Sequence, residues 1–400
     1  MNESDGHRPL RPSAGARIDI LDQMRGLALL AIFLCNLVAL SGASAADGTP
    51  GGWVYLGVHI GLGDSSRTLF SFMFGISMLL VYEGAARRGR RPYATLLRRM
   101  LTLLLIGGIH LFGIWSGDIL FMYALDGLML LAFLWMSPVW QLVSGIVLLI
   151  LTSSTLQSLS YDGGWRYPDP SALPFRLADG LSLYDHPRAF LLISEWQLAI
   201  QHLPFFLFGM YAYRKGIFRL AERFPRRFIG IGLALLAVGL AGKAANSFGY
   251  AAPWLADIAL VYPFAYVAAT LGAVCCILAL GRSRGAASRV LALFGPVGRM
   301  AFTCYLLQSL IYVSVFAPTG EGLFASIGWV GVLPYGRVFA GSLLFFAAQM
   351  AFAYYWQRRF LYGPFEWLWR IGTNLEIPAF RRRRPAQPVD EHGGLPELRS

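Results

Sequence analysis

The stretch Gly107–Gly127, GGIHLFGIWSGDILFMYALDG, predicts a hairpin of two membrane helices joined by a very short turn around Gly117. Three ionisable side chains lie in it among residues apolar enough for the hydrocarbon core of a bilayer: His110, Asp118 and Asp126. An ionisable residue at membrane depth is costly and indicates a functional site by default. If the two helices fold back tightly at Gly117, Tyr123 lies at about the same depth as His110.

The composition favours lipid over water as the main solvent of the chain. Of the 400 residues, 56% are hydrophobic and 14% are charged, and the mean hydropathy is +0.53. Soluble domains carry roughly 25% charged residues. The net charge of +12 does not indicate a nucleic-acid partner, because the arginines form short clusters between apolar runs, as the positive-inside rule describes. All four cysteines lie within apolar runs and lack metal-ligand spacing, so we expect them to pack and expect no metal site.

Ten apolar runs approach the roughly 20 residues that a membrane helix needs. They are residues 24–41, 68–82, 100–115, 119–136, 139–156, 190–213, 228–248, 253–280, 299–316 and 338–356. Basic residues recur in every second loop, which places both termini in the cytoplasm. The first run ends without a clear cleavage site and predicts a retained helix, not a signal peptide. We therefore predict an all-α, polytopic membrane helical bundle of about ten transmembrane helices.

Four regions follow from this pattern. Residues 1–23 form a cytoplasmic segment, 24–356 the membrane bundle, 357–379 an interfacial amphipathic segment, and 380–400 a basic, disordered tail. Within the interfacial segment, Trp367 and Trp369 are typical membrane-surface anchors. The longest outer loop, residues 157–188, is a lid, part of an acceptor site or a spacer.

His110 is the strongest candidate for chemistry. It lies ten residues into its helix, about 15 Å deep at 1.5 Å per residue, where a neutral imidazole could act as a general base. A structural histidine bonded to a neighbouring helix explains the position equally well. Asp118 could orient this histidine or bind a substrate hydroxyl, or it could cap the following helix. Asp126 lies deeper and needs a polar partner or a water-filled cavity.

The other candidates are spread along the chain. Arg25 could meet a phosphate-bearing substrate, pair with Asp22 or anchor the first helix at the cytoplasmic surface. His59 precedes the second run as a loop histidine that could reach a central cavity. Glu195 and His202 are seven residues apart and share one helix face. We also assign substrate contacts to the side chains near the turn and in the ninth run: Trp115, Arg299 and Gln308.

Five segments resemble the YeiB-like family of bacterial inner-membrane proteins, which carries domain of unknown function 418. They are RIDILDQMRGLALLAIFLCN (17–36), LFSFMFG (69–75), GGIHLFGIWSGDILFMYALDGL (107–128), GRMAFTCYLLQSLI (298–311) and GPFEWLWR (363–370). The resemblance implies a C-terminal family region from about residue 215. The chain departs at Cys304, where the family pattern has asparagine.

The family is in turn distantly similar to transmembrane acyltransferases such as heparan glucosaminide N-acetyltransferase, through the pattern D-x-x-R-G at residues 22–26. That similarity implies a histidine that passes an acyl group from cytoplasmic acyl-CoA to an acceptor on the other side. In the heparan enzyme this histidine falls where His59 lies here, and His110 is the alternative.

Three hypotheses about function follow. The first is an acyltransferase acting on an envelope glycan, a lipid or a small exported molecule, with acyl-CoA as co-substrate and no tightly bound cofactor. In it Arg25, Arg98 and Arg99 hold the donor phosphates, and Tyr123 or Gln308 steadies the acyl carbonyl. The second is a transporter of a small organic or lipid-linked solute that uses Asp126, Glu195 and His202. The third is a non-catalytic membrane partner protein.

Overall fold

The computed structural model describes residues 19–46, 48–158, 187–248, 261–281, 283, 285–316 and 333–382. Within these ranges all regular secondary structure is helical. The only β-type pairing there consists of two isolated bridges, Ser44 with Pro334 and Phe360 with Arg381. The all-α prediction is therefore confirmed.

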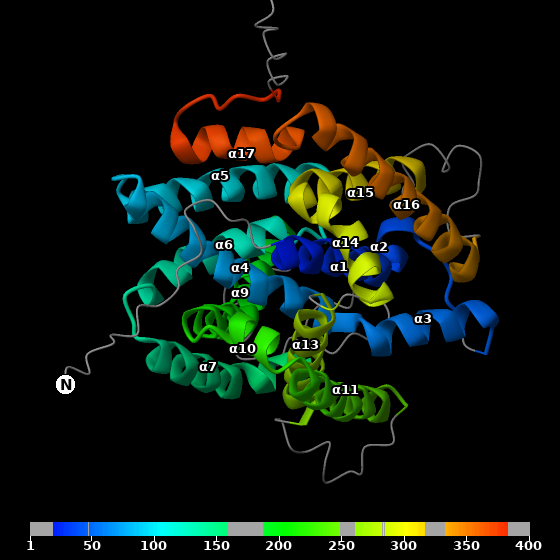
Figure 1. Ribbon diagram of the computed structural model, residues 1–400. Helices are drawn as coiled ribbons and strands as arrows, with labels where there is room; N and C mark the ends of the chain where they lie inside the picture. Colours follow the sequence, from blue (N-terminus) through cyan, green and yellow to red (C-terminus); the bar gives the residue numbers. More distant parts are fainter. Residues whose placement is uncertain are drawn as a thin grey trace, which may run out of the picture.

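The first half of the chain contributes helices to the centre of the bundle and to its edges (Figure 1). Its helices are α1 (Asp19–Cys35), α2 (Leu37–Ser41), α3 (Pro50–Gly61), α4 (Gly63–Arg87), α5 (Pro92–Gly113), α6 (Leu120–Leu130), the 3-10 turn η1 (Leu131–Phe133) and α7 (Pro138–Ser158). Proline stands in the first turn of α3 and α5, where its missing N–H costs nothing. The predicted hairpin of residues 107–127 is present as the α5–α6 pair.

The second half packs around this centre. It consists of α9 (Pro187–Arg214), α10 (Ile217–Arg223), α11 (Pro225–Ser247), α13 (Val261–Gly281), α14 (Ala286–Arg299), α15 (Ala301–Phe316), α16 (Tyr335–Arg359) and α17 (Pro364–Asn374). The tightest helix pairs are α11 with α13, α1 with α14, and α4 with α9.

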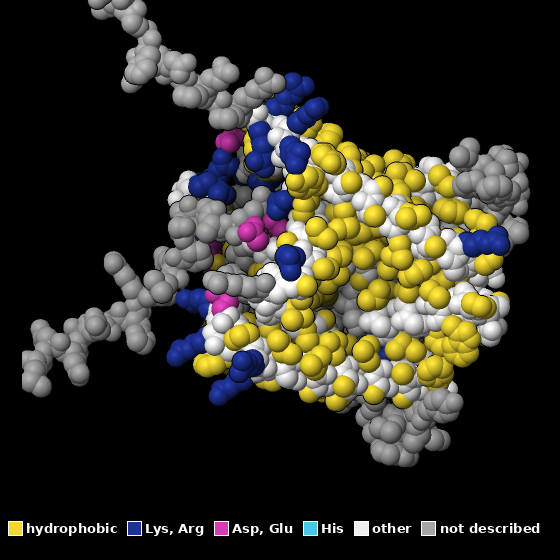
Figure 2. Space-filling view, turned by 45° about the vertical axis from the view of Figure 1, so that its right-hand side comes forward, with side chains coloured by type: hydrophobic (Ala, Val, Ile, Leu, Met, Phe, Trp, Pro, Cys, Tyr) yellow, Lys and Arg dark blue, Asp and Glu magenta, His cyan; other side chains and the backbone are white. Residues whose placement is uncertain are grey.

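Among the described residues, five helices are long and apolar enough to cross a membrane: Pro50–Arg87, Pro92–Gly113, Pro225–Ser247, Phe264–Gly281 and Tyr335–Arg359. The pair α14 and α15, bent by 79°, makes a sixth candidate if it is one span. Leu344 and Leu105 are 74% and 66% exposed, and Figure 2 shows apolar side chains over a broad face, with Lys and Arg mostly along its left edge. This surface is that of a membrane protein. The count of ten spans and the cytoplasmic termini stay predictions.

Three predicted boundaries were wrong. The first run breaks at Asn36 into α1 and α2. The second run is part of a longer helical stretch, because α3 and α4 continue from Pro50 to Arg87 with one break at Leu62; His59 is therefore a helix residue and not a loop residue. Arg299 ends α14 and does not open the next helix. The N-terminal segment, most of the 157–188 loop and most of the basic tail lie outside the described residues.

Helix α17 is the predicted amphipathic segment, and it packs against α5. The Trp369 indole donates to the Arg99 carbonyl at 2.8 Å, and the Arg99 guanidinium lies 3.5 Å from the centre of the Trp369 ring. Glu366 joins α17 to the start of α15, where its Oε1 accepts hydrogen bonds from the backbone N–H groups of Phe302 at 2.8 Å and Thr303 at 3.0 Å.

Removing this cap should loosen the bend between α14 and α15. We expect Glu366→Ala to lower the free energy of unfolding by about 0.5–2 kcal/mol, the usual effect of losing an N-cap. Glu366→Gln should lower it less, because one acceptor oxygen remains.

The stabilisation from Glu366 should also depend on pH. Burial raises the pKa of Glu366 above its usual value, against the opposing hydrogen bonds from Thr303 and Phe302. The stabilisation linked to this proton is full below the unfolded-state pKa and is lost as pH rises through the folded-state pKa. Thermal unfolding in detergent should therefore show the largest difference from wild type at acidic pH; a difference that grows with pH would contradict this.

Candidate functional site: a polar core inside the helical bundle

His110 and Asp118 form the centre of a buried polar group, which we call the His110 cluster (His110, Asp118, Tyr305 and Ser309). The His110 Nδ1 atom is 2.7 Å from Asp118 Oδ1, although the ring N–H is not aligned for a hydrogen bond. On the other side of the ring, Nε2 is 2.8 Å from Ser309 Oγ. Two lone pairs at 2.7 Å would repel, so the proton of a neutral ring belongs on Nδ1. Nε2 is then an acceptor for the single Ser309 hydroxyl proton, for which the Tyr305 carbonyl at 3.0 Å competes.

Asp118 both orients the histidine and caps α6, the two roles that the sequence left as alternatives. Its Oδ2 accepts from the Phe121 N–H at 2.7 Å, in the first turn of α6. Its Oδ1 faces His110 and also accepts from the Tyr305 hydroxyl at 3.3 Å. That hydroxyl in turn accepts from the Ile119 N–H at 3.1 Å. One carboxylate therefore links α5, α6 and α15.

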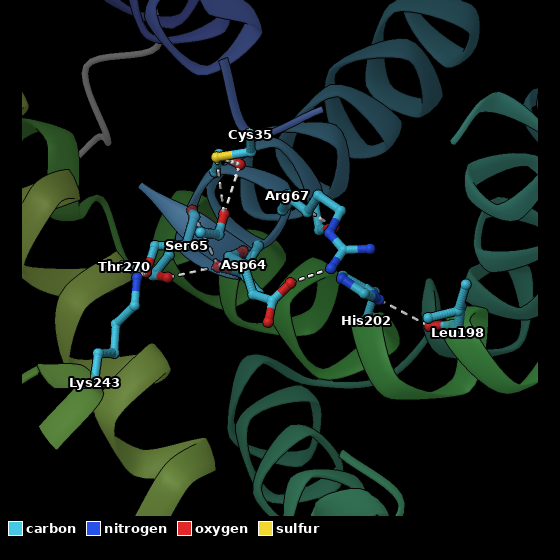
Figure 3. Close-up of polar contacts among 12 residues, drawn as sticks. Cys35, Asp64, Ser65, Arg67, Leu198, His202, Lys243 and Thr270 are labelled. Atoms are coloured by element: carbon cyan, nitrogen blue, oxygen red, sulfur yellow. Dashed lines mark hydrogen bonds and ion pairs between the residues drawn. The ribbon is translucent and has the colours of Figure 1, made fainter. Parts of the chain in front are cut away.

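A second buried group lies around Arg67, the Arg67 cluster (Asp64, Arg67, Tyr123 and His202). Arg67 forms an ion pair with Asp64 on the same helix, one turn away. His202 Nδ1 is 2.8 Å from the Leu198 carbonyl, which can only accept, so this nitrogen carries the proton. Figure 3 shows the His202 ring beside the Arg67 guanidinium. Tyr123 belongs here and not to the His110 cluster, because its hydroxyl donates to the Arg67 carbonyl at 3.0 Å.

Lys243 extends this polar region toward α11. Its side chain is buried, and its Nζ donates to Ser65 Oγ at 3.2 Å (Figure 3). Nearby, the hydroxyls of Thr68 and Thr270 are 2.6 Å apart and join α4 to α13. Lys243 was not predicted as a site residue, although a lysine inside a predicted span is itself a functional signal.

Two predicted site residues carry unpartnered buried atoms. Asp126 on α6 is fully buried, and neither carboxylate oxygen has a hydrogen-bond partner among the described residues. Glu195 on α9 is 3% exposed, and its Oε2 likewise has none there. The two carboxyl groups interact electrostatically, and Glu195 also interacts with Asp118 and Arg67. The polar core is thus continuous between the two clusters.

The predicted donor-site arginines lie near α17. Arg25 pairs with Asp22 at 2.9 Å and also donates to Ser77. Arg99 lies within electrostatic range of Arg25 and Arg370. Arg98 points elsewhere, because its Nε donates to the Thr373 carbonyl at 3.0 Å near the end of α17.

The side chains of three other predicted residues contact other groups than the His110 ring. His59 stacks on Tyr55 within α3, with ring centres 5.9 Å apart. Gln308 faces α16, where its Nε2 donates to Gln349 Oε1 at 2.8 Å. Trp115 packs over the turn at Gly117, where any side chain would overlap its ring.

Arg299 also lies away from the His110 cluster, because it donates to the Gln357 side chain on α16. Among the described residues there is no group of three or more His, Cys, Asp or Glu side chains that could hold a metal ion.

An all-helical bundle with several membrane-length helices and ionisable groups buried at its centre defines the class of the protein as an α-helical membrane protein. Residues 212–376 match the family model described as "Protein of unknown function (DUF418)". This match, together with the relatives described below, supports the resemblance to the YeiB-like family that the sequence motifs predicted.

Curated relatives match along most of the chain. "Uncharacterized protein YxaH" of Bacillus subtilis (strain 168) is 29% identical over 90% of this chain and 94% of its own length. "Uncharacterized protein YeiB" of Escherichia coli (strain K12) is 26% identical over 88% of this chain and 94% of its own. No solved structure matches the chain significantly. These relatives are bacterial, and their names assign no reaction.

Proposed function

We propose that this protein is a multi-pass protein of the bacterial inner membrane that transfers an acyl group from acyl-CoA to an acceptor of the cell envelope. The acceptor class is a glycan, a lipid or a small exported molecule. The observation that carries the proposal is the pair of contacts of His110, with a carboxylate on one ring nitrogen and a hydroxyl on the other. This is the arrangement that activates an oxygen nucleophile in acyl transfer.

In this proposal His110 is the general base. Its Nε2 takes the proton of the acceptor hydroxyl or amine as that group attacks the thioester carbonyl. The new bond to the acyl carbon forms, the C–S bond breaks, and the proton leaves Nε2 for the departing thiolate. Asp118 keeps the ring oriented and stabilises the imidazolium that forms in between.

The place of the acceptor is marked by Ser309, whose hydroxyl now occupies the hydrogen-bonding position at Nε2. Because His110 is only 1% exposed, the acceptor reaches it only when α15 or the tip of the α5–α6 hairpin moves. Tyr305 lies against the same ring, with centres 5.5 Å apart. We assign to its hydroxyl, which donates to Asp118 while the acceptor is absent, the role of steadying the acyl carbonyl that was predicted for Tyr123 or Gln308.

The donor phosphates are assigned to Arg25, Arg99 and Arg370. Three like charges within electrostatic range repel one another, and a bound anion would relieve that repulsion. Arg98 is left out of this set because its Nε donates to the Thr373 carbonyl and Arg98 is not among the charges that act on Arg99.

Acyl-CoA binding to purified protein in detergent tests the proposal directly. Calorimetry should show binding to wild type and to His110→Ala, and at least tenfold weaker binding to Arg25→Ala and Arg99→Ala, because each loses a charged phosphate contact worth about 1.5–3 kcal/mol. Arg87→Ala is the matched control, since Arg87 is exposed and pairs only loosely with Glu83 at 3.6 Å. Folded wild-type protein that binds no acyl-CoA would sink the acyltransferase proposal.

A transporter is the second candidate, favoured by the unpartnered carboxyl groups of Asp126 and Glu195 deep in the bundle. Transporter sites typically place such groups near the bilayer midplane. Solute uptake into proteoliposomes that Asp126→Asn abolishes would support this function over the enzyme.

A further inference from the structure

Asp126 lies on α6 and Glu195 on α9, and these two helices pack against each other. Both side chains are at least nine-tenths buried. The acyl-transfer proposal uses neither of them. They are also chemically unlike the other buried acids of the core.

The difference lies in their partners. Asp118 accepts three hydrogen-bonding or ionic contacts, from His110, Phe121 and Tyr305. Asp64 has the Arg67 guanidinium. By contrast, both oxygens of Asp126 and Oε2 of Glu195 have no hydrogen-bond donor within the described part of the chain. An ionised carboxylate buried without a donor is strongly disfavoured, whereas a protonated carboxyl group is neutral and costs far less.

The charges around the pair reinforce this. Asp126 interacts with Glu195, and Glu195 with Asp118, so the nearest electrostatic neighbours include other acids. The cation that acts on Glu195 is Arg67 on α4, which is ion-paired with Asp64. Other buried titratable groups of the surrounding helices include His202 on α9, His110 on α5, Tyr123 on α6 and Tyr305 on α15. Two buried carboxyl groups that repel each other electrostatically and lack hydrogen-bond donors cannot both ionise easily.

We propose that Asp126 and Glu195 form a proton-binding site between α6 and α9, in which at least one of the two carboxyl groups is protonated at neutral pH. The ligand is a proton, because a proton neutralises a buried carboxyl group that has no hydrogen-bond donor beside it. Loss of the proton would leave two like charges across the α6–α9 interface. The site therefore couples protonation to the packing of these two helices.

Infrared spectroscopy of the full-length protein in lipid nanodiscs tests this without any knowledge of the substrate. The wild type at neutral pH should show the C=O stretching band of a protonated carboxyl group, shifted in heavy water. The band should be lost in Asp126→Asn/Glu195→Gln, whose amides keep the shape of the side chains. Asp64→Asn is the matched control and should leave the band unchanged, because Asp64 is ionised beside Arg67.

Raising the pH should remove the band from wild type. Three results would overturn the proposal: no band that the double variant removes, a band that persists in the double variant but disappears in Asp64→Asn, or a band that sodium ions abolish at constant pH, which would make the site a sodium site. Thermal unfolding of the double variant checks that it is folded. None of these readouts depends on acyl-CoA.

Discussion

Asp118→Ala is expected to lower the free energy of unfolding by about 1–3 kcal/mol for each buried hydrogen-bond donor that it leaves without an acceptor. The carboxylate and the His110 ring are both buried, at 2.7 Å from each other. The same substitution removes the acceptor of the Phe121 N–H and of the Tyr305 hydroxyl. Three helices therefore lose contacts at one point.

Chemical unfolding of the purified protein in mixed detergent and lipid micelles would measure this loss. Asp118→Asn should lie between wild type and the alanine variant, because its amide oxygen can still cap α6 while the attraction to His110 is gone. Glu376→Ala provides the control. Its carboxylate is 67% exposed and pairs with Arg90 at 2.8 Å, so its removal should change stability by no more than about 1 kcal/mol.

A double-mutant cycle separates the His110–Asp118 interaction from the contribution of Asp118 as the cap of α6. If His110 and Asp118 interact as described, the loss in His110→Ala/Asp118→Ala should be smaller than the sum of the two single losses, because the second substitution removes a group already left without its partner. Strictly additive losses would show that the two side chains do not stabilise each other.

The α5–α6 hairpin and the His110–Asp118 pair could be predicted because the two residues are only eight positions apart along the chain and are joined by a short turn. Their other partners could not. Ser309 and Tyr305 come from a helix almost 200 residues later, and helical periodicity does not indicate which distant helix packs against a given face.

The Arg67 cluster shows a different reason for failure. Asp64 and Arg67 precede the apolar run that begins at Thr68, so hydropathy placed them in an outer loop. The structure buries them because α4 begins at Gly63 and continues α3 with a single break. The spacing of three residues between an acid and a base was the available signal, since such pairs share a helix face.

Glu195 and His202, predicted to share one helix face, both lie on α9, yet they interact with different residues. His202 lies in the Arg67 cluster, and Glu195 lies nearer to Asp126 and Asp118. Helical spacing predicts that two side chains lie on the same side of a helix, but it does not predict which residues of other helices they contact. The close approach of α4 to α9 decides which groups meet, and two glycines make that approach possible.

Gly209→Ala is expected to destabilise the protein by about 1–3 kcal/mol, the usual cost of overpacking a dense interior. A Cβ atom at Gly209 on α9 would overlap the Phe72 carbonyl on α4, and one at Gly75 on α4 would overlap the Phe206 carbonyl on α9. Backbone atoms cannot rotate away as a side chain can. Small residues at helix contacts of this kind let the backbones of membrane helices come close together.

A glycine-to-alanine substitution at a position with free space around it should stabilise the protein instead. Gly230 on α11 has no atom near its missing Cβ, so Gly230→Ala should stabilise the protein by about 0.5–1 kcal/mol through helix propensity alone. Thermal unfolding of both variants beside wild type gives the comparison. Separation of α4 from α9 should also disturb the contact of His202 with Arg67, visible as a shift of the His202 ring signals in NMR spectra of Gly209→Ala but not of Gly230→Ala. Equal effects of the two substitutions would mean that α4 and α9 are not packed through these glycines.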